Sequence, residues 1–244
     1  MREPFILTSP PDSEGFLAIP DDEANHLTKV LRFSPGDRFV AIDGVGNGWQ
    51  AEIVGVSKRE LKARVLEKLP VETERKSITV AIGAVKGPRM EWAVEKAAEL
   101  GASAFIPLKT RYAVVEPGEG RSRRWKNIAV AAAKQSRRLT LMKIEYLMAI
   151  ADLPVQKYQS VWVFDLTDDA IPLTDFGALA SLGVTDHREG ILILIGPEGG
   201  FSDEERQFFR TIGTRFISLG SHPLRTETAL VAALVMAKSH LKDR

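Results

Sequence analysis

Residues 191–229 read ILILIGPEGGFSDEERQFFRTIGTRFISLGSHPLRTETA, and this stretch decides the fold. Residues 191–195 are a continuous run of β-forming residues, typical of a strand buried on both faces, and GPEGG follows them directly. Ser202, with a glutamate three positions later, predicts a capped helix, and a short strand over residues 215–219 leads into a second loop. Thr226 is expected to cap a final helix. Because strand-end loops on one edge of a parallel sheet form a crevice, we expect a ligand pocket here.

The glycines of these loops indicate how such a pocket would bind its ligand. Glycine lets backbone N–H and C=O groups approach a ligand without a Cβ atom in the way, so the loops can bind a nucleoside edge through main-chain hydrogen bonds. The first loop matches neither G-x-x-x-x-G-K-[ST] nor G-x-G-x-x-G, which argues against a triphosphate site. A Gly-Pro strand exit is also typical of a plain turn, so GPEGG alone leaves both interpretations open.

The two loops taken together indicate a family. GPEGGFS followed at this distance by SLG and LRTETA resembles the bacterial 16S rRNA (uracil-N3)-methyltransferases, which are S-adenosylmethionine (SAM) enzymes of the knotted SPOUT class. HLTKVLR, DG-x-G, EKAAELG and RW-x-x-I-x-x-x-A-x-x-Q-x-x-R lie upstream and extend the resemblance over nearly the whole chain. The chain departs from the family at His222-Pro223, where an arginine and an aliphatic residue are usual.

The resemblance implies a fold, a reaction and partners. The fold is α/β, a mostly parallel sheet with a C-terminal trefoil knot, preceded by a small PUA-like β-barrel. The reaction transfers a methyl group from SAM to uracil N3 in 16S ribosomal RNA of the 30S subunit, without a metal, and the enzyme is a homodimer with its sites at the interface. Two other functions stay open: another SPOUT methyltransferase, acting on a ribose 2′-oxygen or on tRNA, and a non-catalytic RNA-binding factor of ribosome assembly.

The resemblance also implies which residues form the site. Arg225 is the candidate to stabilise negative charge on the uracil carbonyl oxygens or to bind the phosphate, and Glu198 is the candidate base, with Glu227 as the alternative. Each carboxylate also suits a helix cap or a structural salt bridge. The residues expected to bind SAM, mainly through backbone groups, are Leu194, Gly196, Pro197, Glu198, Gly199, Leu219, Gly220, Leu224, Arg225, Thr226 and Ala229.

The composition is that of an ordinary globular protein. The 244 residues are 44% hydrophobic and 27% charged. Cysteine is absent, which excludes disulfides and thiolate ligands, and the four histidines are too scattered for a metal-binding motif. No apolar run approaches the roughly 18–20 residues that cross a bilayer, and the N-terminus lacks the apolar core of a secretory signal. We therefore expect a cytoplasmic protein without a metal.

Positive charge is concentrated in residues 121–143. The formal net charge of the chain is only +1, but this stretch contains eight lysines and arginines and no acid. Such a patch attracts RNA phosphates, although basic residues also suit a solvated helix face. With basic positions near the N-terminus and at two strand exits included, the residues expected to bind RNA are Lys29, Arg32, Lys86, Arg89, Arg111, Arg124, Gln135, Arg137 and Arg138.

Strand and helix patterns divide the chain into two parts. Residues 1–70 contain short strands, a helix over residues 22–32 and a glycine-rich hairpin loop at residues 44–48, and they form the expected PUA-like domain. Residues 71–77 are polar and predict a linker. Residues 78–244 form the expected SPOUT domain, because strands alternate with helices. Its first elements are predicted as strands at 78–84, 104–107, 143–147 and 161–165 and helices at 88–100 and 122–138.

Overall fold

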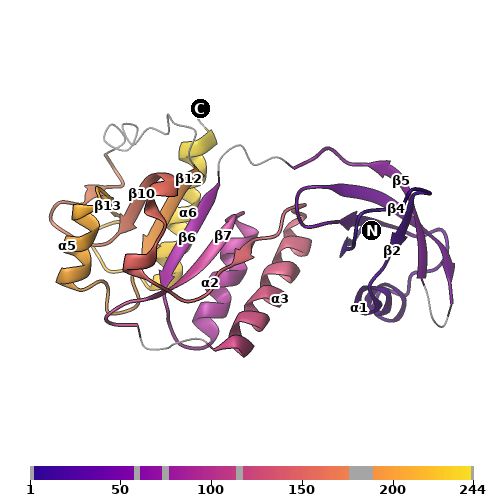
Figure 1. Cartoon of the computed structure of the whole chain (residues 1–244), viewed down its shortest axis with the longest axis horizontal. Helices are drawn as coiled ribbons and strands as arrows, with labels where there is room; N and C mark the ends of the chain where they lie inside the picture. The colour runs from indigo at the N-terminus through magenta and orange to yellow at the C-terminus, as the bar shows by residue number, and fades with distance from the viewer. Residues whose placement is uncertain (1–2, 58–60, 73–76, 114–117, 176–188, 243–244) are drawn as a thin grey trace. The chain divides into compact units, whose positions relative to one another are not determined.

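The structure is a computed structural model that describes residues 3–57, 61–72, 77–113, 118–175 and 189–242. The chain forms two compact units (Figure 1). The first contains Met1–Thr73 and Ala131–Leu141, and the second contains Glu74–Val130 and Met142–Arg244. Most of the expected linker lies outside the described residues, and the expected domain boundaries stay a prediction.

The first unit is built on a five-stranded sheet in the order β1-β3-β4-β5-β2. Strands β1 and β3 are parallel, and the other pairs are antiparallel. The antiparallel pairing of β3 with β4, which brings Ile42 opposite Gly48, confirms that the intervening glycine-rich segment is a hairpin loop. The strands are β1 (Phe5–Leu7), β2 (Phe16–Ala18), β3 (Arg38–Ile42), β4 (Gly48–Val56) and β5 (Leu61–Lys68).

The helix expected over residues 22–32 is only partly α-helical. Helix α1 (Asp21–Asn25) continues into a π-helical turn, η1 (His26–Val30). Within it the Thr28 hydroxyl donates to the Ala24 carbonyl oxygen at 2.7 Å, a side-chain bond that competes with the regular helical ladder. The side chain of Leu27 is fully buried in the core of this unit, which holds the widened turn against the sheet.

The second unit is built on an eight-stranded sheet in which every pair is parallel. The strand order is β11-β13-β10-β12-β6-β7-β8, and β9 also pairs with β7. The strands are β6 (Ile78–Gly83), β7 (Ala104–Lys109), β8 (Lys143–Ile144), β9 (Met148–Ala149), β10 (Tyr158–Phe164), β11 (Ile171–Pro172), β12 (Glu189–Ile195) and β13 (Arg215–Ser218).

Strand β12 lies in the middle of this sheet and is buried on both faces. It pairs with β10 on one side and with β6 on the other, and Ile191, Leu192, Ile193 and Leu194 have no exposed surface. The continuous apolar run of the sequence is therefore a central parallel strand, as predicted. Burial on both faces explains why the run shows no alternation of polar and apolar residues.

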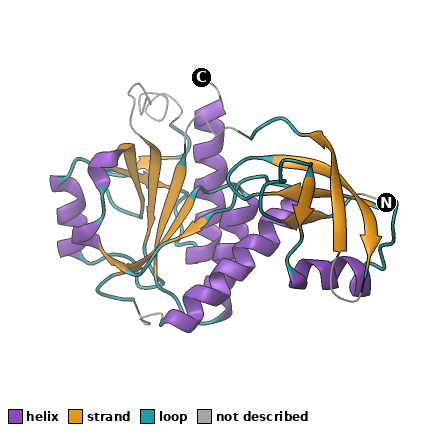
Figure 2. Ribbon diagram, turned by 45° about the vertical axis from the view of Figure 1, so that its right-hand side comes forward, coloured by secondary structure: helices purple, strands orange, loops and turns teal. Residues whose placement is uncertain are grey.

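Helices pack against the sheet (Figure 2). Helix α6 contacts β12, β6 and α2, whereas Phe209 of α5 joins a buried cluster with Leu192 and Leu194 of β12. The helices are α2 (Pro88–Glu99), α3 (Glu119–Ser136), α5 (Asp203–Thr211) and α6 (Thr226–Lys242), with short 3₁₀ turns at Ile150–Asp152 and Val155–Lys157. The trefoil knot implied by the family resemblance stays a prediction.

Several element ends differ from the sequence prediction. The strand expected at residues 143–147 is only Lys143–Ile144, and the strand expected at residues 161–165 is Tyr158–Phe164. Helix α3 ends at Ser136, two residues earlier than expected, because Arg137 adopts a positive φ of 60°. Thr226 is the first residue of α6 rather than its cap. Ser202, in contrast, caps α5 as predicted, with Glu205 completing the capping box.

Candidate functional site

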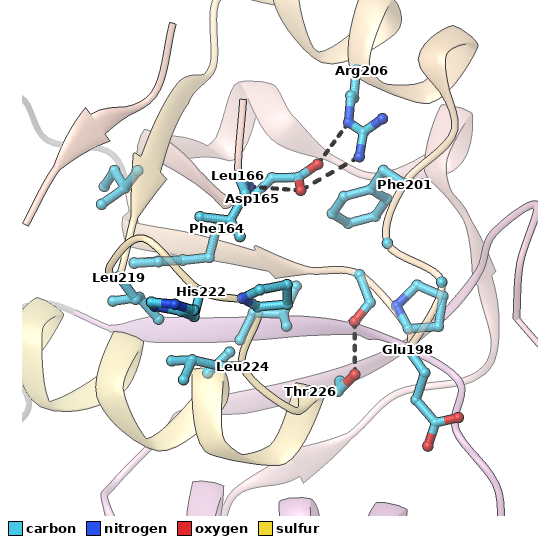
Figure 3. Close-up of a pocket in the computed structure, with 18 residues that line it drawn as sticks. Phe164, Asp165, Leu166, Glu198, Phe201, Arg206, Leu219, His222, Leu224 and Thr226 are labelled. Carbon is cyan, nitrogen blue, oxygen red and sulfur yellow. Dashed lines mark hydrogen bonds and ion pairs between the residues drawn. The ribbon is translucent and has the colours of Figure 1, made fainter. Parts of the chain in front are cut away.

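A pocket of about 300 Å³ opens where three parallel strands end (Figure 3). Its walls come from the segments that follow β10, β12 and β13 and from the first turn of α6. These three strands are neighbours in the sheet, so their carboxyl ends deliver their loops to one edge. The lining residues are Phe164, Asp165, Leu166, Ile195, Gly196, Pro197, Glu198, Gly199, Gly200, Phe201, Arg206, Ile217, Leu219, His222, Pro223, Leu224, Thr226 and Ala229.

The loop after β12 is a tight turn that requires glycine. The Gly200 N–H donates to the Pro197 carbonyl oxygen at 2.8 Å, and Gly200 has a positive φ of 70°. A Cβ atom on Gly196 would lie only 3.0 Å from the carbonyl carbon of Gly200, so a side chain there would force the turn open. The GPEGG sequence therefore folds into a compact loop whose backbone lines the pocket.

A buried hydrogen bond joins this loop to the start of α6. The hydroxyl of Thr226, which is only 4% exposed, donates to the Gly196 carbonyl oxygen at 3.1 Å (Figure 3). The bond satisfies a hydroxyl that would otherwise be buried without a partner. It fixes the first turn of α6 against the GPEGG loop, and the two segments that the sequence singled out thus become one wall.

The loop after β13 is held by its own polar side chains. The Ser218 hydroxyl donates to the Gly220 carbonyl oxygen at 2.7 Å, and the Ser221 hydroxyl lies 2.9 Å from Nδ1 of His222. His222 and Pro223, the two residues that depart from the family pattern, both line the pocket. Sequence reasoning did not include them among the site residues.

Most of the residues expected to bind SAM lie in this one pocket. Three do not line it: Leu194 is fully buried within β12, and Gly220 and Arg225 are exposed. Whether any of these residues binds SAM stays a prediction. Those that line the pocket are Gly196, Pro197, Glu198, Gly199, Leu219, Leu224, Thr226 and Ala229.

The opposite wall of the pocket contains an ion pair that was not predicted from the sequence. Nε of Arg206 on α5 lies 2.8 Å from Oδ2 of Asp165, and the side chains are 25% and 12% exposed. The hydrogen bond to Asp165 raises the pKa of the Arg206 guanidinium above its usual value. Asp165 comes directly after β10, so its place at a strand exit was a signal in the sequence. Its arginine partner is 41 residues away and carried no signal.

The two candidate bases have different surroundings. Glu198 is half-exposed, forms an ion pair with Arg89 at the start of α2, and points away from the pocket in Figure 3. Glu227 is partly buried, and its Oε2 atom has no hydrogen-bond partner among the described residues. The candidate Arg225 is exposed on the loop just before α6.

Four of the eight basic residues in the stretch 121–143 have acidic partners from other parts of the chain. Arg124 pairs with Glu91 at 2.8 Å, Lys134 with Glu23 at 2.6 Å, Arg138 with Glu72 at 3.3 Å and Lys143 with Glu145 at 2.6 Å. Arg138 is only 15% exposed, so its guanidinium supports the fold more than it faces solvent. The positive patch is therefore weaker than its sequence indicates.

The other expected RNA-binding residues lie on the surface. Lys29, Arg32, Lys86, Arg111 and Gln135 are exposed. Arg137 is also exposed, and its guanidinium lies 6.0 Å from the centre of the Phe5 ring. Within the described part of the chain, no ion pair involves Arg121, Arg123, Lys126 or Arg137.

The described residues contain no group of three histidine, aspartate or glutamate side chains that could hold a metal ion. None of the helices that the structure describes is long and apolar enough to cross a membrane.

Comparison with known proteins gives matches over both units. A family model described as an RNA methyltransferase domain matches residues 72–238, and one described as an RNA methyltransferase PUA domain matches residues 19–66. Two relatives named ribosomal RNA small subunit methyltransferase E are 29% identical to this chain. The Mycobacterium tuberculosis protein aligns over 94% of this chain and 88% of its own length, and the Bacillus subtilis protein over 89% and 87%.

Solved structures show the same fold. Ribosomal RNA small subunit methyltransferase E from Neisseria gonorrhoeae, bound to SAM, is 26% identical, with a TM-score of 0.83 over 98% of each chain. A protein from Legionella pneumophila, also with bound SAM, is 27% identical, with a TM-score of 0.84 over 98% of each chain.

Two ion pairs join α5 to the segment after β10, and they differ in how deeply they are buried. Comparing them tests how much burial adds to the contribution of an ion pair to stability. We expect Asp165→Asn to lower the free energy of unfolding by about 1–2 kcal/mol, because it leaves the largely buried Arg206 without its main anionic partner. The pair of Asp169 with Arg210 is 52% and 39% exposed, so Asp169→Asn should cost less than about 0.5 kcal/mol. Urea unfolding measures both, and equal losses would contradict the structural role of Asp165.

Proposed function

This chain belongs to the RNA methyltransferase family, and we propose that it uses SAM to methylate N3 of a uracil in 16S ribosomal RNA. The observation that carries the proposal is the single pocket formed by the GPEGG loop, the loop after β13 and the first turn of α6. Support also comes from relatives named for small-subunit ribosomal RNA and from similar structures that contain SAM. The PUA match in the N-terminal unit favours this function over that of a SPOUT enzyme without such a domain.

The pocket suits SAM in size and in lining. Its volume of about 300 Å³ lies at the lower end of the range for small-molecule sites. Apolar side chains such as Ile195, Leu219 and Ala229 offer a surface for the adenine ring. Backbone groups of the GPEGG loop and of the loop after β13 offer hydrogen bonds to the ribose and to the methionine part. Leu194, Gly220 and Arg225, which do not line the pocket, remain weaker candidates.

The protein must orient the uracil and remove its N3 proton. Bound SAM would supply an electrophilic methyl group, so no metal is required for the transfer. In-line positioning of the uracil then contributes most to the rate of transfer, and a carboxylate accepts the N3 proton. Arg225 is our candidate to hold the negative charge on the uracil carbonyl oxygens, since its exposed guanidinium stays ionised and offers planar donors.

The identity of the base is the open point. Glu198 must leave its ion pair with Arg89 before it can accept a proton, and RNA phosphates that bind Arg89 would release it. Glu227 has no such competitor, and its buried Oε2 atom has no described partner. We keep Glu198 as the proposed base and Glu227 as the alternative.

We propose a cytoplasmic homodimer that acts on the 30S subunit or its RNA. One exposed side of α6 includes Thr228, Val235 and Ser239, and Val235 is 49% exposed. Leu224, 44% exposed, lies just before this helix and lines the pocket, so a second copy on this side would also border the site. A molar mass of one chain by light scattering at micromolar concentration would contradict the dimer.

The reaction itself can be tested with two measurements. We expect the purified protein to bind SAM in titration calorimetry, and we expect 16S RNA from cells lacking the protein to lose one N3-methyluridine that returns with the wild-type gene. Gly196→Val should abolish both, because a side chain there would collide with the backbone at Gly200.

Gly118→Val is the matched control, since a Cβ atom there meets nothing within 4 Å. A protein that does not bind SAM would contradict methyl transfer. SAM binding without any change in ribosomal RNA would contradict the substrate.

The general base can be identified by comparing two variants in which a glutamate is replaced by glutamine. Glu198→Gln is expected to lower the single-turnover rate by about 100-fold and to remove the dependence of the rate on pH, the size typical of a lost general base. Glu227→Gln should then change the rate by less than tenfold. The opposite ranking would transfer the role to Glu227, and an unchanged rate and pH profile for Glu198→Gln would exclude it.

RNA binding by the positive patch can be tested with two neighbouring arginines. Arg137→Ala should weaken RNA binding and reduce the slope of log K against log salt by about 1, because an exposed phosphate contact is lost. Arg138→Ala removes the ion pair with Glu72 instead, so it should lower stability and leave the slope nearly unchanged. Fluorescence anisotropy against salt measures the slope, and equal slopes for Arg137→Ala and wild type would refute the contact.

A further inference from the structure

A large aromatic side chain stands exposed beside the pocket. Tyr112 lies in the turn after β7 and is 50% exposed. Its ring lies against the GPEGG loop: a Cβ atom built on Gly199 would be 3.0 Å from Cβ of Tyr112 and 3.3 Å from Cγ. Gly199 lines the pocket, whereas Tyr112 does not, so the ring stands on the outer side of the loop. The absence of a side chain on Gly199 is what lets the ring come this close.

The turn that carries Tyr112 is fixed to the pocket by one carboxylate. Oε1 of Glu205 accepts the backbone N–H of Arg111 at 2.7 Å, and Oε2 accepts the backbone N–H of Ser202 at 2.8 Å. Ser202 is the cap of α5 and lies two residues after the end of the GPEGG loop. The turn is closed by a hydrogen bond from the Ala113 N–H to the Thr110 carbonyl oxygen at 3.2 Å. Tyr112 is therefore held at a set place relative to the pocket before any ligand arrives.

Hydrophobic burial does not explain this arrangement, because half of the Tyr112 side chain faces solvent. A fixed, exposed aromatic ring with a cation beside it is the usual way in which proteins bind an unpaired base. The exposed side chain of Arg111 adjoins Tyr112 in the same turn, and the Arg89 guanidinium meets the GPEGG loop at Glu198, the neighbour of Gly199. These two cations suit the phosphates on either side of a stacked base.

We infer that Tyr112 is a stacking platform for an unpaired base of the RNA substrate, at the rim of the cofactor pocket. The inference rests on the proposed function, since it places the RNA beside the methyl donor. Stacking uses the face of the ring and not the phenol hydroxyl. The Tyr112 side chain thus positions the RNA base by direct contact and does not contact the cofactor.

Three substitutions test whether the aromatic ring of Tyr112 is required, rather than the size of the side chain or its hydroxyl group. Base stacking is worth about 1–3 kcal/mol, so Tyr112→Leu, which keeps an apolar side chain without a ring, should lower kcat/KM for 16S RNA by roughly 5- to 150-fold. Tyr112→Phe and Tyr112→Trp keep a stacking face and should stay within about threefold of wild type. Tyr146→Leu is the control, because Tyr146 is 80% exposed and lies outside the pocket lining.

Two further measurements distinguish the possible failures. SAM affinity by titration calorimetry should stay within about threefold of wild type in Tyr112→Leu, and an equal loss of SAM and RNA affinity would show that the ring only supports the loop. Anisotropy with a short single-stranded oligouridine, at saturating SAM, should show the same ranking of variants without any turnover. If the wild type methylates ribosomal RNA and Tyr112→Leu matches it in both assays, the stacking role is wrong. If the wild type does not methylate this RNA, the proposed function fails, and the oligouridine ranking still decides the role of Tyr112.

Discussion

The hydrogen bond from the Thr226 hydroxyl to the Gly196 carbonyl oxygen is the contact on which the site depends. It is buried, so neither group can turn to water without a cost of about 1–3 kcal/mol for an unsatisfied polar group. It also connects segments that are 30 residues apart and that flank β13 and α5. The parallel sheet brings the loops to one edge, but this bond sets the distance between them. The pocket therefore depends on both the parallel sheet and this hydrogen bond.

Sequence reasoning identified the parts of the site that are local in the chain. The apolar run before GPEGG, the Ser202 cap and the short strand predicted at residues 215–219 each depend on neighbours within a few positions. Each is found, although the strand ends one residue earlier, at Ser218. Two of the three loops around the pocket were found in this way. Only the family resemblance related the two loops to SAM, because a glycine-rich strand exit is compatible with many ligands.

The rest depended on contacts that the sequence does not display. The strand order places β10 between β12 and β13, and this brings Asp165 into the pocket wall beside Arg206. The acids that neutralise half of the basic stretch come from distant positions such as Glu23 and Glu72, so a count of local charge overestimated the patch. The π-helical turn after α1, in which the Thr28 hydroxyl donates to the Ala24 carbonyl oxygen, is a local feature that no periodicity reveals.

Glu205 ties the segment after the GPEGG loop and the turn at residues 110–113 to the same helix end, because each of its oxygens accepts one backbone amide. In a group transfer, misplacement by a fraction of an ångström between donor and acceptor already slows the reaction. A single carboxylate on a helix end therefore sets the spacing between two surface segments that are about 90 residues apart in the chain.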